Sequence, residues 1–245
     1  MANAPSAVRW VEVDPGRIEG WLDSFAARHG GGSWGVVPPG QHRGGSWGVG
    51  PPGQHRGGSP ETGPELVTVT AADGSVAECH PPFPPLPAGS KGTGAELAAH
   101  AAAPRTVGVL LVRLGGYAAG VFTGPDARLA ASKVGSRLVH GRSAAGGTSQ
   151  HRFARRREKQ ASEALAAAAD NALRVFGQFP ALLDAVVLGG DKRSVAALSA
   201  DARLQPYFAI AVDRFLTVPD PRLNVLQATP RAFRSIRIRL TETAG

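Results

Sequence analysis

From Thr106 onward, short apolar runs alternate with longer amphipathic stretches, and this alternation is the strongest constraint on the fold. Residues 107–113 (VGVLLVR) are almost continuously apolar, and residues 117–123 (YAAGVFT) return after a turn at Leu114-Gly115-Gly116. Runs of this length and composition are typical of buried strands. Strands that alternate with helices indicate an α/β domain, so we predict a mixed central sheet with helices on its faces.

The rest of this part of the chain continues the pattern. We predict a third extended segment over 128–139 and one long helix over 149–176 with a single apolar stripe. The stripe consists of Phe153, Ala161, Leu165, Ala168, Ala172 and Phe176. The other predicted elements are strands over 185–188, 207–212 and 235–240, a helix from Asp191 through Ala200 and a helix near 221–229. Asp191 follows Gly189-Gly190 and is expected to be a helix N-cap.

The first hundred residues predict a small N-terminal α+β unit. A strand over 8–13 leads to Asp14-Pro15, which is typical of an N-cap followed by proline at the first helical position. The helix is expected to stop at His29-Gly30. The elements expected after it are a hairpin of 66–70 and 75–79 joined by an Asp-Gly turn, an extended proline-rich connector over 81–87, and a short helix over 95–103.

An internal duplication interrupts this unit. Residues 31–43 (GGSWGVVPPGQHR) and 44–56 (GGSWGVGPPGQHR) differ at one position. Glycine and proline at this density disfavour a regular helix or a strand interior, so a disordered insertion is expected over 31–60. A binding repeat built on its tryptophans and arginines is the alternative. The expected divisions of the chain are 1–30, the insertion at 31–60, a hairpin and connector at 61–104, and an α/β domain at 105–241.

Charge and cysteine content restrict the partners. The net charge is +8 and the sequence pI is about 10.7, which favours polyanionic partners. Cys79 is the single cysteine, and no Cys or His spacing resembles a metal site, so no metal or cofactor is expected. No secretory leader or bilayer-length apolar run is evident, which predicts a cytoplasmic protein without a membrane partner.

Positive charge is concentrated between Lys133 and Lys159, where eight basic residues face one acid, Glu158. The eight are Lys133, Arg137, Arg142, Arg152, Arg155, Arg156, Arg157 and Lys159. Positions 152, 155, 156 and 159 share one face of the predicted helix. A solvated helix face normally mixes charges of both signs, so this excess predicts contact with nucleic-acid phosphates.

A glycine-rich loop precedes that helix and ends Gly146-Gly147-Thr148-Ser149-Gln150. Consecutive glycines allow positive φ angles and let a ligand approach the main chain closely. The loop lacks the Gly-Lys-Ser/Thr ending of a nucleoside-triphosphate site. Gln150 is uncharged, and its amide is suited to hold a water, a hydroxyl or a carbonyl by hydrogen bonds. His140 and His151 flank the loop; a general base is possible in principle, but ordinary polar loop positions are the better interpretation.

The loop, followed by Arg152-Phe153-Ala154-Arg155, resembles the catalytic loop of archaeal and eukaryotic class-one translation release factors. There, a Gly-Gly-Gln tip precedes an Arg-Phe-Ala-Arg-like helix start. Thr148-Ser149 is inserted here between the glycines and the glutamine. This spacing resembles the Vms-type release-factor-like peptidyl-tRNA hydrolases, and specifically their actinobacterial branch. The resemblance is closest from Thr106 to Leu240, extends to the N-terminal strand and helix, and omits the duplicated insertion.

The resemblance implies a release-factor catalytic domain that hydrolyses peptidyl-tRNA in ribosome rescue, without a cofactor or DNA. Gln150, with Gly146 and Gly147, would act on the ester in the peptidyl-transferase centre. The implied partners are the large ribosomal subunit, rRNA and peptidyl-tRNA. The implied RNA-binding residues are Arg142, Arg152, Arg155, Arg156, Arg157 and Lys159.

Two other functions remain open from the sequence. One is a tRNA endonuclease that releases the peptide with a tRNA 3′ fragment, and the other is a non-catalytic ribosome- or rRNA-binding factor. No stop-codon-reading module is evident, so codon-dependent termination is not expected. Arg237 and Arg239 would extend the RNA surface or simply occupy the solvent side of the last strand, with Ile236 and Ile238 facing inward.

Overall fold

The chain divides into two compact units. A computed structural model describes residues 7–37, 65–113, 115–136, 150–179 and 182–243; for 150–157 it describes the backbone only. Unit 1 comprises Met1–Ser46, Pro52–Ala103 and Arg231–Gly245, and unit 2 comprises Trp47–Pro51 and Pro104–Pro230. Each unit contains one five-stranded sheet among the described residues.

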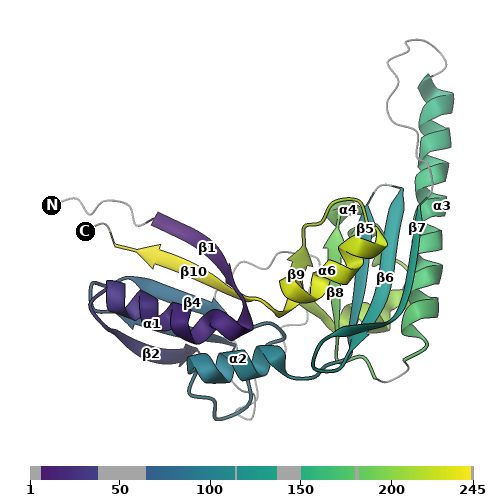
Figure 1. The fold of residues 1–245 in the computed structure, drawn as a ribbon. Coiled ribbons are helices and arrows are strands. Elements are labelled where there is room, and N and C mark those ends of the chain that lie inside the picture. The colour runs from purple at the N-terminus through teal and green to yellow at the C-terminus, as the bar shows by residue number, and fades with distance from the viewer. Residues whose placement is uncertain (1–6, 38–64, 114, 137–149, 180–181, 244–245) are drawn as a thin grey trace. The chain divides into compact units, whose positions relative to one another are not determined.

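Unit 1 contains an antiparallel sheet with the strand order β1-β10-β4-β3-β2 (Figure 1). Its strands are β1 (Ala7–Val13), β2 (Gly32–Val37), β3 (Leu66–Ala71), β4 (Val76–His80) and β10 (Ile236–Glu242). The predicted hairpin is confirmed as β3 and β4. Gly74 in its turn has a φ of +84°, a conformation that glycine adopts without steric cost.

Helices cover one face of this sheet. The elements are the 3₁₀ turn η1 (Pro15–Arg17), α1 (Ile18–Arg28) and α2 (Gly94–Ala102). The predicted N-cap is confirmed, because the Asp14 carboxylate accepts a hydrogen bond from the Gly16 amide at 2.9 Å. Thr93 and Glu96 form a capping box at the start of α2. Ile18, Leu22 and Phe25 of α1 are fully buried, and each such burial stabilises the unit by roughly 2 kcal/mol.

The structure corrects two expectations for this unit. Gly32–Val37, expected to lie in a disordered insertion, form β2, because these six residues precede Pro38, the first proline of the duplicated segment, and pair with β3 at the edge of the sheet. Residues 38–64 lie outside the described part. The last strand, β10, was expected in the second domain, but it pairs with β1 and β4 of unit 1.

Unit 2 contains a mixed sheet, as predicted, with the order β7-β6-β5-β8-β9. Its strands are β5 (Val107–Arg113), β6 (Gly116–Thr123), β7 (Arg128–Ser136), β8 (Ala185–Gly190) and β9 (Ala211–Leu216). β5, β8 and β9 are parallel, whereas β5, β6 and β7 are antiparallel. The parallel strands are joined by helical crossovers, as parallel pairing requires.

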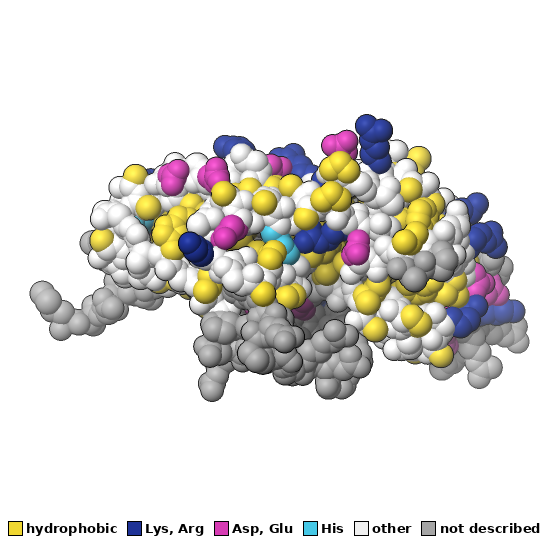
Figure 2. Space-filling view, turned by 90° about the horizontal axis from the view of Figure 1, so that it is seen from below, with side chains coloured by type: hydrophobic (Ala, Val, Ile, Leu, Met, Phe, Trp, Pro, Cys, Tyr) yellow, Lys and Arg dark blue, Asp and Glu magenta, His cyan; other side chains and the backbone are white. Residues whose placement is uncertain are grey.

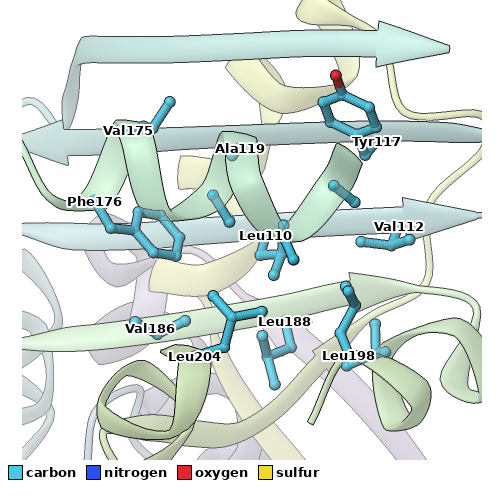
Figure 3. Packing of buried hydrophobic residues seen from close by; sticks show 14 of the residues in the cluster. Leu110, Val112, Tyr117, Ala119, Val175, Phe176, Val186, Leu188, Leu198 and Leu204 are labelled. Carbon is cyan, nitrogen blue, oxygen red and sulfur yellow. The ribbon is translucent and has the colours of Figure 1, made fainter. Parts of the chain in front are cut away.

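The helices of unit 2 are α3 (Gln150–Phe176), α4 (Lys192–Leu198), the 3₁₀ turn η2 (Ala202–Leu204), α5 (Gln205–Ala209) and α6 (Leu223–Arg234). The buried side chains of α3, α4 and α5 form one core with alternate residues of β5, β6 and β8 (Figure 3). Gly120 points to the opposite face of the sheet, where a Cβ would lie 2.9 Å from Leu226 of α6. The sheet therefore has helices on both faces, and α6 continues into unit 1 after Pro230.

One predicted strand is wrong in its position. Residues 207–212 were expected to be a strand, but Tyr207–Ala209 belong to α5 and β9 begins at Ala211. Asp201 caps the preceding turn by accepting a hydrogen bond from the Arg203 amide. Pro206 then occupies the first turn of α5, a position that favours a helix. The prediction that Asp191 caps the helix after β8 is confirmed, since it accepts a hydrogen bond from the Ser194 amide at 3.0 Å.

Candidate functional site

Gln150 is the first residue of α3, which has 27 residues. β7 ends at Ser136, and residues 137–149 connect the two elements. Gly146, Gly147, Arg142 and His140 fall in that connection and lie outside the described residues. The predicted long helix is confirmed, and it starts at the glutamine that the sequence singled out.

The first half of α3 extends beyond the sheet of unit 2 (Figure 1). Ala168 and Ala169 are the first fully buried residues along the described part of the helix, and Leu165 and Ala167 pack against the same core while partly exposed. Glu158 and Lys159, nearer the start, are exposed. Fifteen residues separate Gln150 from Leu165, which corresponds to about 22 Å of helix. The helix therefore holds Gln150 far from the core that anchors it.

The buried part of α3 is joined to the sheet by a polar contact as well as by packing. The Asn171 amide donates a hydrogen bond to the Tyr117 hydroxyl on β6 at 2.7 Å. Neither residue was predicted from the sequence to have a role. Tyr117 is a polar-tipped side chain in the otherwise apolar 117–123 run, and Asn171 lies beside Ala172 of the apolar stripe. The sequence did contain a signal: the predicted strand and the predicted helix each have one polar residue on the face that is expected to pack against the other.

The net charge of the chain resides entirely in unit 2. This unit has 17 Lys and Arg against nine Asp and Glu, whereas the rest of the chain has ten of each. Residues 133–159 supply eight of the basic residues and one of the acids. On the face of the molecule seen in Figure 2, by contrast, basic and acidic side chains are interspersed. Along the sequence, positive charge is thus concentrated around the start of α3.

The first turn of α3 contains no acidic residue. A helix start carries a partial positive charge and is normally stabilised by acids, so basic residues there are unfavourable without a bound anion. The helical backbone over 150–159 puts positions 152, 155, 156 and 159 on one face, as the spacing predicted. Lys159 is exposed; the side chains of Arg152, Arg155, Arg156 and Arg157 lie outside the described part. This arrangement is electrostatically suited to a polyanion.

Arg237 and Arg239 belong to a different unit from the basic residues of α3, because β10 is part of unit 1 and α3 is part of unit 2. Ile236 and Ile238 are fully buried, as expected of the inward-facing side of the strand. Arg239 forms a 2.9 Å ion pair with Glu78, and the Arg237 guanidinium lies 4.6 Å from the centre of the Trp10 ring. Both side chains therefore have partners in unit 1, whose charges balance.

A small open pocket lies in unit 2 beside the point where α3 leaves the sheet. Its lining includes Ala161, Ala164 and Leu165 of α3, Gly115 and Gly116 from the β5–β6 turn, and Arg113 and Ser194. Within the described residues, no group of three or more His, Cys, Asp or Glu has a metal-binding arrangement. None of the described helices combines the length and apolarity needed to cross a membrane.

Comparison with known proteins gives a family. A family model described as Actinobacteria/chloroflexi VLRF1 release factor matches residues 105–239, more than half of the chain. No curated protein matches. Among solved structures, an archaeal translation termination factor, aRF1, is 13% identical with a TM-score of 0.40; the match covers 92% of this chain and 64% of that one. A second, described as an archaeal protein, is 17% identical with a TM-score of 0.29 and coverages of 67% and 50%.

Proposed function

Because the chain belongs to the Actinobacteria/chloroflexi VLRF1 release factor family, we propose that it is a peptidyl-tRNA hydrolase that acts on the ribosome. The observation that carries the proposal is the position of Gln150 at the start of a helix about 22 Å beyond the core. The reaction adds water to the ester between the peptide and the terminal ribose of tRNA. Its products are a free peptide carboxylate and an intact tRNA 3′ end.

Gln150 and the glycines before it supply the proposed chemistry. The amide orients the attacking water. Together with main-chain N–H groups at Gly146 and Gly147, it stabilises the negative charge that develops on the carbonyl oxygen of the ester. An amide suits this role because it donates and accepts hydrogen bonds without changing its charge over the physiological pH range. No step of this reaction requires a metal or an organic cofactor.

The basic residues hold the tip against RNA in this proposal. Arg142, Arg152, Arg155, Arg156, Arg157 and Lys159 contact phosphates of rRNA or tRNA in the large subunit. Seven of the eight units of net charge lie between residues 133 and 159, which supports this assignment. Bound phosphates would offset the repulsion among these residues and their unfavourable position at the helix start.

The test is peptide release from peptidyl-tRNA bound to isolated large ribosomal subunits. Gln150→Ala should lower the release rate by about 10²–10³-fold, the usual effect of losing one such donor. Gln160→Ala is the matched control, because it makes the same change on the same helix ten residues further along. The control should release peptide at the wild-type rate. Release by Gln150→Ala at the wild-type rate would rule out the proposed role of this residue.

The state of the tRNA product separates hydrolysis from cleavage of the tRNA itself. Hydrolysis leaves the 3′ terminus intact, so the recovered tRNA should accept an amino acid again without repair. A shortened 3′ end, with the missing nucleotides still attached to the peptide, would show an endonuclease instead. Binding to large subunits without either product would show a non-catalytic factor.

A further inference from the structure

Tyr117 and Asn171 form a polar contact between the central sheet of unit 2 and the buried part of α3. The Asn171 amide nitrogen donates to the Tyr117 hydroxyl at 2.7 Å and also to the Ala167 carbonyl oxygen at 2.7 Å. Tyr117 is 9% exposed and belongs to the core beneath α3 (Figure 3). A hydrogen bond in such surroundings fixes direction as well as distance, which apolar packing does less strictly.

A third element, β7, contacts Tyr117. Gly135, the penultimate residue of β7, is paired directly with Tyr117 on β6. A Cβ at Gly135 would overlap the phenol ring and hydroxyl of Tyr117, so the glycine leaves the space that the ring occupies. Tyr117 therefore contacts both elements that flank residues 137–149: β7, which precedes them, through Gly135, and α3, which follows them, through Asn171.

Close packing is reduced just before this contact along α3. Ala161, Ala164 and Leu165 line the small open pocket together with Gly115 and Gly116. Five of the eight residues that line the pocket are glycine, alanine or serine, so this part of the helix has few van der Waals contacts that would resist a tilt. The direction of the preceding half of α3 is thus set mainly by what holds the helix from Leu165 onward.

We propose that Tyr117 and Asn171 are positioning residues that fix the direction of α3 and thereby the location of Gln150. Fifteen residues separate Gln150 from Leu165, so about 22 Å of helix projects beyond the core, and a tilt of about 5° moves its tip by about 2 Å. Displacements of about 1 Å cost an enzyme up to about 10²-fold in rate. The consequence for catalysis rests on the proposed function; the effect on helix direction does not.

The structural arm of the test measures the direction of α3 directly. Spin labels on Lys159→Cys and Arg128→Cys, both exposed positions of unit 2, report the distance between α3 and the start of β7. The native Cys79 is fully buried, and burial raises the pKa of its thiol to about 12, so it does not compete for the label. Tyr117→Phe should broaden the distance distribution relative to the wild type. Tyr207→Phe, the same change at the other tyrosine packed against this core, should leave it unchanged.

Asn171→Ala provides a second variant, since alanine favours the helix while removing the donor. It should broaden the distribution as Tyr117→Phe does. A distribution identical to that of the wild type in both variants would overturn the proposal, whether or not the protein releases peptide. Lack of release by the wild type would overturn the proposed function alone, because the distance measurement does not depend on activity.

The functional arm separates positioning from mere stability. Tyr117→Phe should lower kcat for peptide release about tenfold or more at a temperature where the variant is fully folded, with KM unchanged. A structural role alone would lower the melting temperature and leave kcat of the folded protein as in the wild type. A broadened distribution with an unchanged kcat would contradict the assignment of Tyr117 as a positioning residue for the reaction.

Discussion

Gly190 lies directly against the backbone carbonyl of Val112, where β8 ends beside β5. Its φ of +104° is a conformation that other residues rarely adopt, and the next amide, of Asp191, donates to the same Val112 oxygen at 2.7 Å. We expect Gly190→Ala to lower the free energy of unfolding by about 2–4 kcal/mol, because it adds both backbone strain and an overlap with the main chain. Urea denaturation measures the change.

The control for this prediction is Gly124→Ala. Gly124 also has a positive φ, +77°, but a Cβ there would meet no atom within 4 Å. The cost should therefore be limited to backbone strain, about 1–2 kcal/mol. Equal losses in the two variants would show that the close approach to Val112 contributes nothing.

The acid stability of unit 1 should depend on Asp73. Its carboxylate accepts a 2.7 Å hydrogen bond from His29, and this bond, with a second from the Ser75 amide, lowers the pKa of Asp73 below its ordinary 3.8. A lowered carboxyl pKa stabilises the folded state above the ordinary value, and the contribution is lost as the pH falls through the lower folded value. We expect Asp73→Asn to reduce the dependence of the melting temperature on pH below about pH 4.

Asp23→Asn, a change at an exposed position of α1, serves as the comparison. It should leave the slope of melting temperature against pH close to that of the wild type. Parallel curves for Asp73→Asn and the wild type down to pH 2 would contradict the prediction.

Removing the N-cap of α4 should destabilise unit 2 moderately. The Asp191 carboxylate accepts hydrogen bonds from the Ser194 amide at 3.0 Å and the Ser194 hydroxyl at 2.7 Å. Asp191→Ala should cost about 1 kcal/mol in the free energy of unfolding, whereas Asp191→Asn, which retains an acceptor oxygen, should cost less. Equal stability of Asp191→Ala and the wild type in urea denaturation would exclude a capping contribution.

The salt dependence of ribosome binding should reveal the role of the basic helix. Arg155→Ala combined with Arg156→Ala should weaken binding to large subunits. It should also reduce the slope of log K against log salt by about 1 to 2, because fewer counterions are released on binding when phosphate contacts are lost. The control is Arg128→Ala combined with Arg174→Ala, two exposed arginines outside the first half of α3. If both double variants kept the wild-type slope, phosphates would not be the partners of Arg155 and Arg156.

Much of the fold could be predicted because local patterns and tertiary packing agree. The buried strands around Leu110 and Val121 are apolar on both faces, which is a strong signal over a short run. Residues 207–212 show where the signal fails. Tyr207 and Phe208 suit a strand by composition, but Pro206 and the capped turn before it favour a helix, and a short apolar run does not distinguish the two. The partners of β10 depend on contacts between distant residues, which periodicity does not encode.

The candidate site also has a part that could be predicted from the sequence and a part that could not. Gln150 and the basic residues after it are neighbours in sequence, so their pattern was visible without a structure. Tyr117 and Asn171 are 54 positions apart, and their hydrogen bond arises only when α3 packs on β6. A contact of this kind becomes visible when the sheet and the helix register are known.

The pairing of β10 between β1 and β4 has a consequence for the order in which the protein matures during synthesis. All the described elements of unit 2 up to β9 precede residue 217, so they are available for folding while translation continues. The sheet of unit 1 combines β1, which precedes unit 2 in the chain, with β10, which follows β9, and among the described strands β1 pairs with β10 alone. The sheet of unit 1 is thus completed only after the strands of unit 2 have been made, because β10 joins β1 to β4.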